Sequence, residues 1–569
     1  PVIFLGEWCR LHDRKDIWSK LDARVVPYHW NDRQKLFRDY EYLMNLHERI
    51  LSEMAKNLNS IHNQKHSIRY WRILLGPWLG WILPIFFDRW SMIQKVVNEY
   101  DISHCRIIDD DYYNYTSSNM LEFSKNATTD RWNQFIYSFI IEKWTNIDCE
   151  KFLCVSPSIK SNSHSPSFIS MKNKIMNNLI DYYNILSTLG LKQDDAFISS
   201  ELMPFTKLLQ FQLKLGQLPQ YWKHVHPIQS CIDTSLRQWK IQIPFSNNFE
   251  RALCSLIPLQ LPTLYLEGYN KLLKQISALP RPLKPKFICC GTSQIGDDVF
   301  KAWSAKMVDC GVPLYIIQHG GHYGSGLFSF HEEHEILISD MYCSWGWSLN
   351  SSNKVIPTVA TKLLGGRKKA KWNPKGNALL VTAATPRYSY WLYSAMIAGQ
   401  WLDYFDDICT FFDSLPASIQ SDVLVRQKKS DYEWNQIARW KERYRNISVD
   451  TGDCPIEKLT QNCRLFISTY NATTFLETLA KNIPTIIFWN TEHWELRSSA
   501  LPYFKQLEKV GIFHQNPYLA AVKVSEIWDD VTSWWYNAEV QEARKVFCNQ
   551  YARIPDNPIR ELTQLLDNK

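Results

Sequence analysis

The second half of the chain alternates short apolar runs with helical patterns, and this alternation is the strongest constraint on its fold. Beyond residue 377, strand-like runs recur at 378–383, 423–426, 447–449, 465–468 and 485–488, with helical patterns between them. Strands separated by helices pair in parallel, because each helix carries the chain back across the face of the sheet. The pattern predicts a doubly wound α/β domain.

The first half carries the same rhythm less regularly. Strand-like runs fall at 2–5, 25–28, 105–108, 152–155, 196–199, 287–290 and 313–317. A long helix is expected from Asn31 or Asp32 to about Leu58, and the segment 291–296 is expected to be a loop between a strand and a helix. With 569 residues, the chain is long enough for two such domains. We expect an N-terminal domain over 1–364, a linker over 365–377 and a C-terminal domain over 378–569.

Composition narrows the functional classes. The net charge of +7 is small for this length and is not gathered into a stripe, which argues against a nucleic-acid partner. The Lys- and Arg-rich cluster at 367–371 indicates a solvated linker, with contact to anionic lipid headgroups as the alternative. No CxxC pair occurs, which favours reduced thiols and a cytoplasmic protein, in which peripheral contact with the inner membrane surface stays open.

The one membrane-like stretch is 73–87. It is too short to span a bilayer and is interrupted by Pro77, Gly80 and Pro84. It therefore predicts a buried helix pair in a core. A scaffold that uses this stretch to bind a lipid surface is the alternative.

Two segments at strand ends predict a phosphate site. Asn471, Thr473 and Thr474 follow the strand at 465–468 and open a helix, whose N–H groups and dipole favour an anion. Glu477 lies just inside this helix, where it can hold a ribose hydroxyl or cap the turn. An ordinary N-cap is the alternative reading of the turn. Its position at the carboxyl end of a strand favours a ligand site.

The second segment is the glycine-rich turn at 318–324. Its glycines allow close backbone approach, and its histidines can donate to a phosphate or a sugar carboxylate. No acidic or thiol partner stands at ligand spacing from the two histidines, so we predict no metal site and no bound cofactor. The donor-contact residues expected here are Gln318, His319, Gly320, Gly321 and His322.

Three acidic residues near strand ends are candidates for the catalytic carboxylate: Glu201, which we prefer, and Glu7 and Asp32. Glycosyl transfer needs a carboxylate to deprotonate a hydroxyl or to attack the anomeric carbon. A helix cap or a structural ion pair is the alternative for each. Arg69, Trp71 and Arg72 combine guanidinium groups with a ring, which suits an anionic acceptor, and an interior ion-pair network is their alternative.

Several of these blocks resemble a family of bacterial transferases encoded among genes for surface polysaccharide and lipopolysaccharide synthesis. The matching blocks are FLGEWC at 4–9, PYHWNDR at 27–33, RYWRILLGPWL at 69–79, QHGGHYG at 318–324, WGW at 345–347 and STYNATTFLETL at 468–479. The QHG and NATTFLE blocks are similar, more distantly, to capsule-type GT-B transferases that use CMP-activated ulosonic acids such as Kdo or its nine-carbon relatives.

The resemblance implies a GT-B fold of two Rossmann-type domains that face a cleft, and transfer of a nucleotide-activated sugar to a glycan or lipid-linked glycan without a metal. One departure is that capsule-type enzymes often carry a His-Pro pair after a second-domain strand, where this chain has Arg426 and Gln427. We expect Arg426 to contact the donor in its place, with a different nucleotide site as the alternative. A sugar-nucleotide epimerase of the same fold and a non-catalytic glycan-binding or assembly protein are the rival functions.

Overall fold

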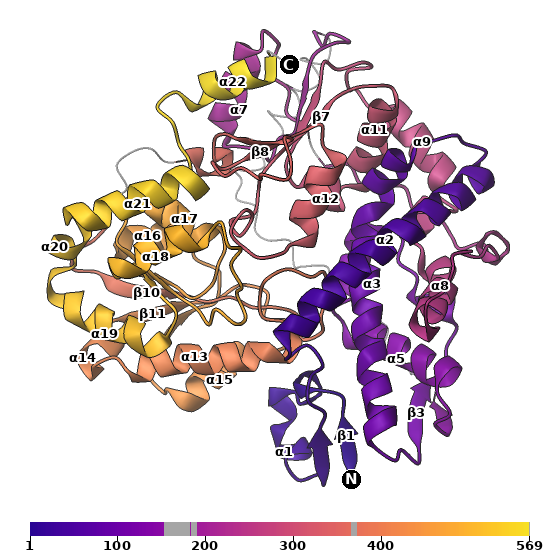
Figure 1. Cartoon of the computed structure of the whole chain (residues 1–569), viewed down its shortest axis with the longest axis horizontal. Helices are drawn as coiled ribbons and strands as arrows, with labels where there is room; N and C mark the ends of the chain where they lie inside the picture. Colours follow the sequence, from indigo (N-terminus) through magenta and orange to yellow (C-terminus); the bar gives the residue numbers. More distant parts are fainter. Residues whose placement is uncertain (153–182, 184–189, 223, 366–371, 568–569) are drawn as a thin grey trace. The chain divides into compact units, whose positions relative to one another are not determined.

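The computed structural model describes residues 1–152, 183, 190–222, 224–365 and 372–567 (Figure 1). The chain divides into two compact units that are interleaved along the sequence. Unit 1 comprises Pro1–Leu43, Gln318–Glu333 and Tyr342–Pro558, and unit 2 comprises Met44–Ile317, His334–Met341 and Ile559–Lys569. Most of the expected linker 365–377 and the basic cluster within it lie outside the described residues.

The main sheet of unit 1 has six parallel strands in the order β12-β11-β10-β13-β14-β15. Numbered along the chain, this order is 3-2-1-4-5-6, that of the dinucleotide-binding fold. The strands are β10 (Asn377–Val381), β11 (Val423–Arg426), β12 (Ser448–Asp450), β13 (Cys463–Ser468), β14 (Thr485–Phe488) and β15 (Phe513–His514). The expected strands of this half are confirmed within a few residues, and β15 was not anticipated.

Helices cover both faces of this sheet, as crossover connections require. Figure 1 shows α13 on one side of β10 and β11, and α17 and α21 on the other. The helices of the sheet domain are α13 (Trp401–Asp413), α14 (Ala417–Gln420), α15 (Gln436–Arg443), α16 (Ile456–Asn462), α17 (Thr473–Ala480), α18 (Leu501–Lys509), α19 (Pro517–Ile527), α20 (Val531–Trp535) and α21 (Ala538–Tyr551). The central strands β10, β13 and β14 are almost entirely apolar and buried, which explains their continuous hydrophobic runs.

In unit 1, β1 (Val2–Phe4) pairs in parallel with β2 (Ala23–Val25). The strand β8 (Met341–Ser344), whose first residue belongs to unit 2, pairs in parallel with β9 (Val355–Pro357) through Tyr342–Ser344 of unit 1. The helix α1 (Lys15–Trp18) joins the first pair. The helices α2 (Arg33–His62) and α12 (Phe330–Ile338) have residues in both units. The long helix expected from about residue 32 is therefore confirmed, one turn longer than predicted.

In unit 2, β5 (Phe197–Ile198), β6 (Ile288–Cys290) and β7 (Leu314–Ile317) are parallel, and so are β3 (Cys105–Ile108) and β4 (Cys149–Phe152). Residues 153–155 of the expected strand 152–155 lie outside the described part. The helices are α3 (Ile68–Glu99), α4 (Met120–Asn126), α5 (Asp130–Trp144), α7 (Phe205–Lys214), α8 (Asn248–Gln260), α9 (Tyr269–Ser277), α10 (Ser293–Gly296), α11 (Asp298–Asp309) and α22 (Pro558–Asp567). Part of the loop expected at 291–296 is thus helical, because Ser293 opens a turn that Glu201 caps.

The membrane-like stretch is the middle of α3. The predicted helix pair is wrong, since α3 continues as one helix through Pro77 and Pro84. The predicted burial in a core is confirmed: α3 packs against α5 and α11, and 94% of its most apolar window is buried. By length and composition alone, α3 could also cross a membrane. Buried core helices of water-soluble proteins meet the same two criteria.

The parallel sheets with helical crossovers confirm the expected α/β class. In unit 1, the strands β10, β11 and β13 end in register, since Val381 pairs with both Arg426 and Ser468. The residues that follow these three strands therefore lie along one edge of the sheet. The order in which successive strands are added reverses between β10 and β13, which places the topological switch point at this edge.

Candidate nucleotide site

A cavity of about 440 Å³ lies at the switch point of the unit 1 sheet, and we call it the unit 1 cavity. Its walls come from the ends of β10, β11 and β13, from the first turn of α17 and from the segment 391–396. Its lining residues are His322, Val381, Thr382, Ala383, Ala384, Thr385, Trp391, Tyr393, Met396, Arg426, Gln427, Lys428, Lys429, Ile456, Tyr470, Asn471, Ala472, Thr474 and Trp494. Small-molecule sites of parallel α/β sheets occupy this position.

The charge of the lining is one-sided. Three cations, Arg426, Lys428 and Lys429, and the imidazole of His322 border the cavity, and its lining contains no aspartate or glutamate. Arg426 is held by Asp450 and by the carbonyl oxygen of Cys454, whereas both lysines are exposed. Such a lining favours an anionic ligand.

The turn at 470–474 carries the phosphate-binding features predicted from the sequence. No side-chain oxygen caps α17 at Ala472, so the N–H groups of its first turn are not used by a local cap. Asn471 is buried and donates to Ser325 Oγ, while its Oδ1 makes no hydrogen bond. Thr474 Oγ1 donates to the hydroxyl of Tyr470.

Thr473 has a different role from Thr474. Its Oγ1 accepts a hydrogen bond of 3.1 Å from Gly321 N, and it does not line the cavity. A Cβ on Gly321 would come within 2.4 Å of Thr473 N, so only glycine allows this approach. The close approach predicted for the glycine-rich turn is therefore made to the chain's own backbone.

Gln318 and Gly320 also serve the turn itself. The Oε1 of Gln318 accepts from Trp345 N and Trp347 Nε1, both at 2.8 Å, and its Nε2 donates to the carbonyl oxygen of Gly320. This buried amide ties the WGW segment to the glycine-rich turn. Neither Gln318 nor Gly320 lines the cavity.

The two histidines of the turn differ in position. His322 lines the cavity, where its Nε2 is 3.1 Å from Ser329 Oγ, and its ring contacts that of Tyr393. His319 lies outside the lining, with Nε2 3.4 Å from the hydroxyl of Tyr323. Burial, followed by nearby Lys362 and His322 for His319 and by Arg497 for His322, lowers the pKa of each imidazole to about 3. Both are therefore neutral at physiological pH.

Glu477 lies one turn into α17 and does not line the cavity. Burial raises its pKa, and its Oε2 is 3.8 Å from Lys481 Nζ. Of the residues predicted to hold the donor, the structure thus brings together His322, Arg426, Asn471 and Thr474 around one cavity. It places Gln318, His319, Gly320, Gly321, Thr473 and Glu477 outside the lining.

The sequence reasoning missed part of the lining. Trp391 and Tyr393 stack with ring centroids 4.2 Å apart, and Lys428 and Lys429 directly follow Arg426 and Gln427. The aromatic run at 388–393 lies in an irregular segment, where no periodicity marks it. The cluster of rings next to a strand end was the signal available.

The three candidate carboxylates are each engaged locally. Glu201 Oε1 accepts from Ser293 N at 3.2 Å and from Ser293 Oγ at 2.5 Å, and Oε2 accepts from Ser199. Glu7 pairs with Arg10 at 2.6 Å. Asp32 Oδ1 accepts from Lys35 N and so caps α2. The catalytic role stays a prediction for all three.

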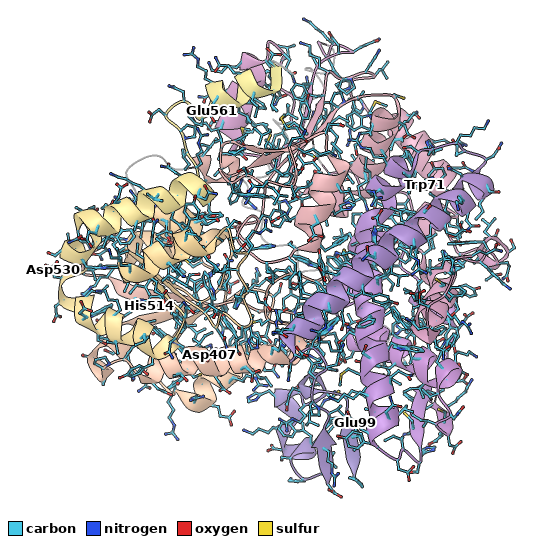
Figure 2. All side chains as sticks on the ribbon, viewed as in Figure 1. Trp71, Glu99, Asp407, His514, Asp530 and Glu561 are labelled. Carbon is cyan, nitrogen blue, oxygen red and sulfur yellow. The ribbon has the colours of Figure 1, made fainter. Side chains whose placement is uncertain are left out.

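The predicted acceptor residues lie in the first turns of α3. Arg72 pairs with Glu48, and Arg69 Nη2 is 2.8 Å from Asp340. Trp71, labelled in Figure 2, is fully buried and donates to Asn59 Oδ1 at 3.0 Å. These contacts fit the structural alternative, and acceptor binding here stays a prediction. No group of three His, Cys, Asp or Glu residues in the described ranges could hold a metal ion.

The fold and the cavity define a doubly wound α/β protein with an anion-favouring site at the switch point of its sheet. The chain belongs to the LIC12162 family of transferases, whose family description matches residues 1–566. No curated protein matches the sequence.

Three solved structures are similar to the chain at low identity. They are TarM (13% identity, 50% of this chain, 55% of TarM, TM-score 0.33), MurG of Acinetobacter baumannii (12%, 68%, 96%, 0.29) and a variant of the wall teichoic acid polymerase TagF (8%, 70%, 95%, 0.31). The chain thus spans about half the length of TarM. Because these TM-scores are low, the fold class rests on the strand order.

Proposed function

We propose that this transferase is a GT-B glycosyltransferase and that the unit 1 cavity holds the nucleotide of its activated-sugar donor. The observation that carries the proposal is the composition of the cavity: cations, an imidazole and no carboxylate at the switch point of a parallel sheet. The nucleotide phosphate would lie at the first turn of α17, beside Asn471 and Thr474. Trp391 and Tyr393 offer faces on which a base can stack.

The reaction would break the bond between the anomeric carbon and the phosphate oxygen of the donor and form a bond from that carbon to an acceptor hydroxyl oxygen. The electron pair of the broken bond leaves on the phosphate, whose charge the helix N–H groups, Lys428 and Lys429 would offset. Glu201 would accept the proton of the acceptor hydroxyl. His319 is neutral at physiological pH and would donate a hydrogen bond to the phosphate or carboxylate of the donor, so that no metal is required.

A CMP-linked acidic sugar, such as a ulosonic acid, is the donor that we favour. Its carboxylate adds a second negative charge next to the phosphate, and the lining itself has cations and no carboxylate, although Asp450 and Asp453 outside the lining pair with Arg426 and Lys429. The acceptor would be a bacterial surface glycan, free or linked to lipid, reached from the cytoplasmic side of the membrane.

Incubation of the full chain with CMP-, UDP- and GDP-sugars, with and without a surface-glycan acceptor, tests the proposal. A glycosyltransferase releases nucleotide quickly only when the acceptor is present and attaches the sugar to it. Fast release of nucleotide without an acceptor would indicate the epimerase instead. Absence of both nucleotide binding and transfer would favour a non-catalytic glycan-binding protein.

A further inference from the structure

A second cavity, of about 760 Å³, lies in unit 2 at the carboxyl ends of β5 and β6, and we call it the unit 2 cavity. Aromatic side chains, two histidines and a buried arginine line it, together with Glu201. Its volume is that of a site for a small organic ligand. Apart from Glu201, the proposed function uses none of these residues.

Arg281 is the unusual member of this lining. Its side chain is 7% exposed, and its guanidinium lies over the rings of Phe197 and Trp303, at 5.2 and 4.9 Å from their centroids. Within the described part of the chain its guanidinium forms no hydrogen bond or ion pair, and its Nη1 is shielded from water. Burial lowers its pKa to about 10, so it remains charged at neutral pH.

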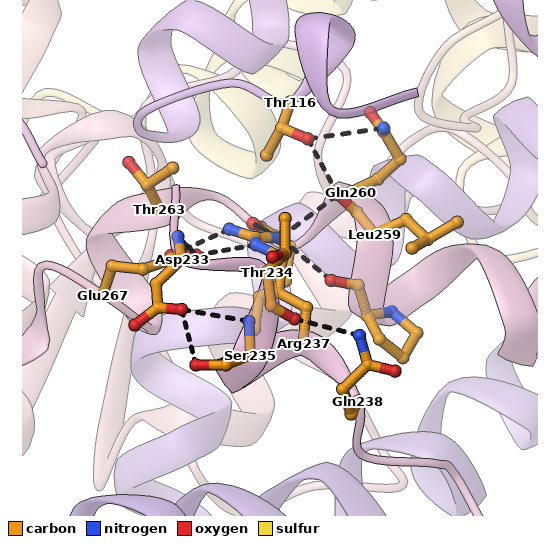
Figure 3. Close-up of polar contacts among 12 residues, drawn as sticks. Thr116, Asp233, Thr234, Ser235, Arg237, Gln238, Leu259, Gln260, Thr263 and Glu267 are labelled. Atoms are coloured by element: carbon orange, nitrogen blue, oxygen red, sulfur yellow. Dashed lines mark hydrogen bonds and ion pairs between the residues drawn. The ribbon is translucent and has the colours of Figure 1, made fainter. Parts of the chain in front are cut away.

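Arg237 of the same unit shows how a structural arginine is satisfied at similar burial (Figure 3). Its Nε and Nη2 bind both carboxylate oxygens of Glu267, at 2.7 and 2.8 Å. Its Nη1 donates to three carbonyl oxygens of the segment 258–261. Stacking on rings alone does not offset the cost of burying a charged group that forms no hydrogen bond. The guanidinium of Arg281 therefore lacks a hydrogen-bond acceptor, and an anionic group of a ligand can fill this place.

The carboxylates of the cavity do not fill this role. Glu201 accepts from Ser199 and Ser293, and Asp297 caps α11 by accepting from Phe300 N at 2.9 Å. Neither forms an ion pair with Arg281, although the charge of nearby Asp297 raises the pKa of the guanidinium and so opposes the effect of burial. Both line the cavity, where their carboxylate oxygens can accept hydrogen bonds from hydroxyl groups of a ligand.

Two more hydrogen-bond donors of the lining have no partner in the described structure, Trp222 Nε1 and Ser200 Oγ. The ring of Trp222 stacks on Phe197 with centroids 5.2 Å apart. Aromatic faces, unpartnered donors and carboxylates together match the apolar faces and hydroxyl groups of a sugar.

We infer that the unit 2 cavity binds an acidic sugar unit, with its carboxylate or phosphate on Arg281 and its ring and hydroxyl groups on Trp222, Ser200 and Glu201. That this sugar unit is part of the acceptor rests on the proposed function, whereas the binding of an acidic sugar in this cavity does not depend on it.

Titration of the full chain with glucuronate, glucose 6-phosphate and glucose, followed by ligand-observed NMR, tests the inference. At least one acidic probe should bind at least tenfold more tightly than glucose, and the stronger of the two identifies the anion as carboxylate or phosphate. Arg281→Met should remove this preference. Arg251→Met, which removes an exposed arginine of the same unit outside the cavity, should keep it.

Equal binding of all three probes, binding of none, or an unchanged preference in Arg281→Met would overturn the inference. If Arg281→Met does not fold, Trp222→Phe keeps an aromatic ring and removes the indole N–H, and it should weaken binding of the acidic probe severalfold. Nucleotide binding by Arg281→Met should equal that of the parent. A loss of sugar binding with intact nucleotide binding, or the reverse, thus separates this inference from the proposed nucleotide site.

Discussion

The two cavities lie at equivalent places in their units, the carboxyl edge of a parallel sheet, but their linings differ in charge. The unit 1 cavity has three cations and no carboxylate. The unit 2 cavity has two carboxylates and one buried arginine whose guanidinium forms no hydrogen bond or ion pair with the described residues. A ligand with several negative charges fits the first, and a ligand with one negative charge and many hydroxyl groups fits the second. The carboxyl edge of each sheet therefore determines where the cavity lies, and the side chains that follow the strands determine which ligand it can bind.

The largest effect is expected from the carboxylate of the unit 2 cavity. Glu201→Gln should lower kcat by orders of magnitude and leave donor affinity nearly unchanged, because the amide cannot accept the proton of the hydroxyl. Steady-state kinetics and nucleotide titration of the same protein measure the two quantities. Near-normal turnover would contradict this role for Glu201. The same kinetics on Glu7→Gln and Asp32→Asn would then test the other two carboxylates.

The two threonines of the unit 1 turn should separate binding from stability. Thr474→Val removes a hydroxyl from the cavity and should weaken nucleotide binding severalfold at an unchanged Tm. Thr473→Val leaves Gly321 N without its acceptor, which costs about 1–3 kcal/mol, and should lower Tm. Thr532→Val, at an exposed site of the same unit, is the matched control. Identical behaviour of the two variants would contradict the distinction.

His319 provides a milder test of the unit 1 site. His319→Ala should raise the donor KM or lower kcat, and His319→Asn, which keeps a hydrogen-bond donor, should do so less. Because no metal is required by the proposed chemistry, activity should survive EDTA. Complete loss in EDTA that one divalent ion restores would show instead that a metal takes part.

The smallest expected effect is on the pH dependence of stability. His319 and His322 have folded-state pKa values of about 3, below the ordinary 6.5, so the unfolded chain takes up their protons first as the pH falls. Their contribution to stability is complete above pH 6.5 and is lost progressively as the pH falls toward 3. The double variant His319→Asn, His322→Asn should show a smaller drop in Tm between pH 7.5 and 5 than the parent. An equal drop would contradict the burial of these imidazoles.

The sequence predicted what depends on local patterns and missed what depends on long-range packing. Strand ends such as 465–468 and the turn at 471–474 are readable because buried parallel strands are continuous apolar runs followed by cap residues. Pro77 and Pro84 suggested a broken helix, but packing of α3 against its neighbours keeps it continuous. Arg281 and Trp222 come from separate irregular segments, so no spacing in the sequence indicates that they share a cavity.

Nucleotide binding by three forms of the full chain tests the central claim most directly. Thermal-shift titration with CMP, UDP, GDP and ADP should show that one nucleotide raises the Tm of the parent and of Arg281→Met equally. At 100 times its Kd, this nucleotide should add about 2.7 kcal/mol to the free energy of unfolding. Asn471→Leu, which replaces the buried amide of the unit 1 cavity, should weaken that binding at least tenfold. Parent-like binding by Asn471→Leu, or loss of binding in Arg281→Met, would contradict the assignment of the nucleotide to unit 1.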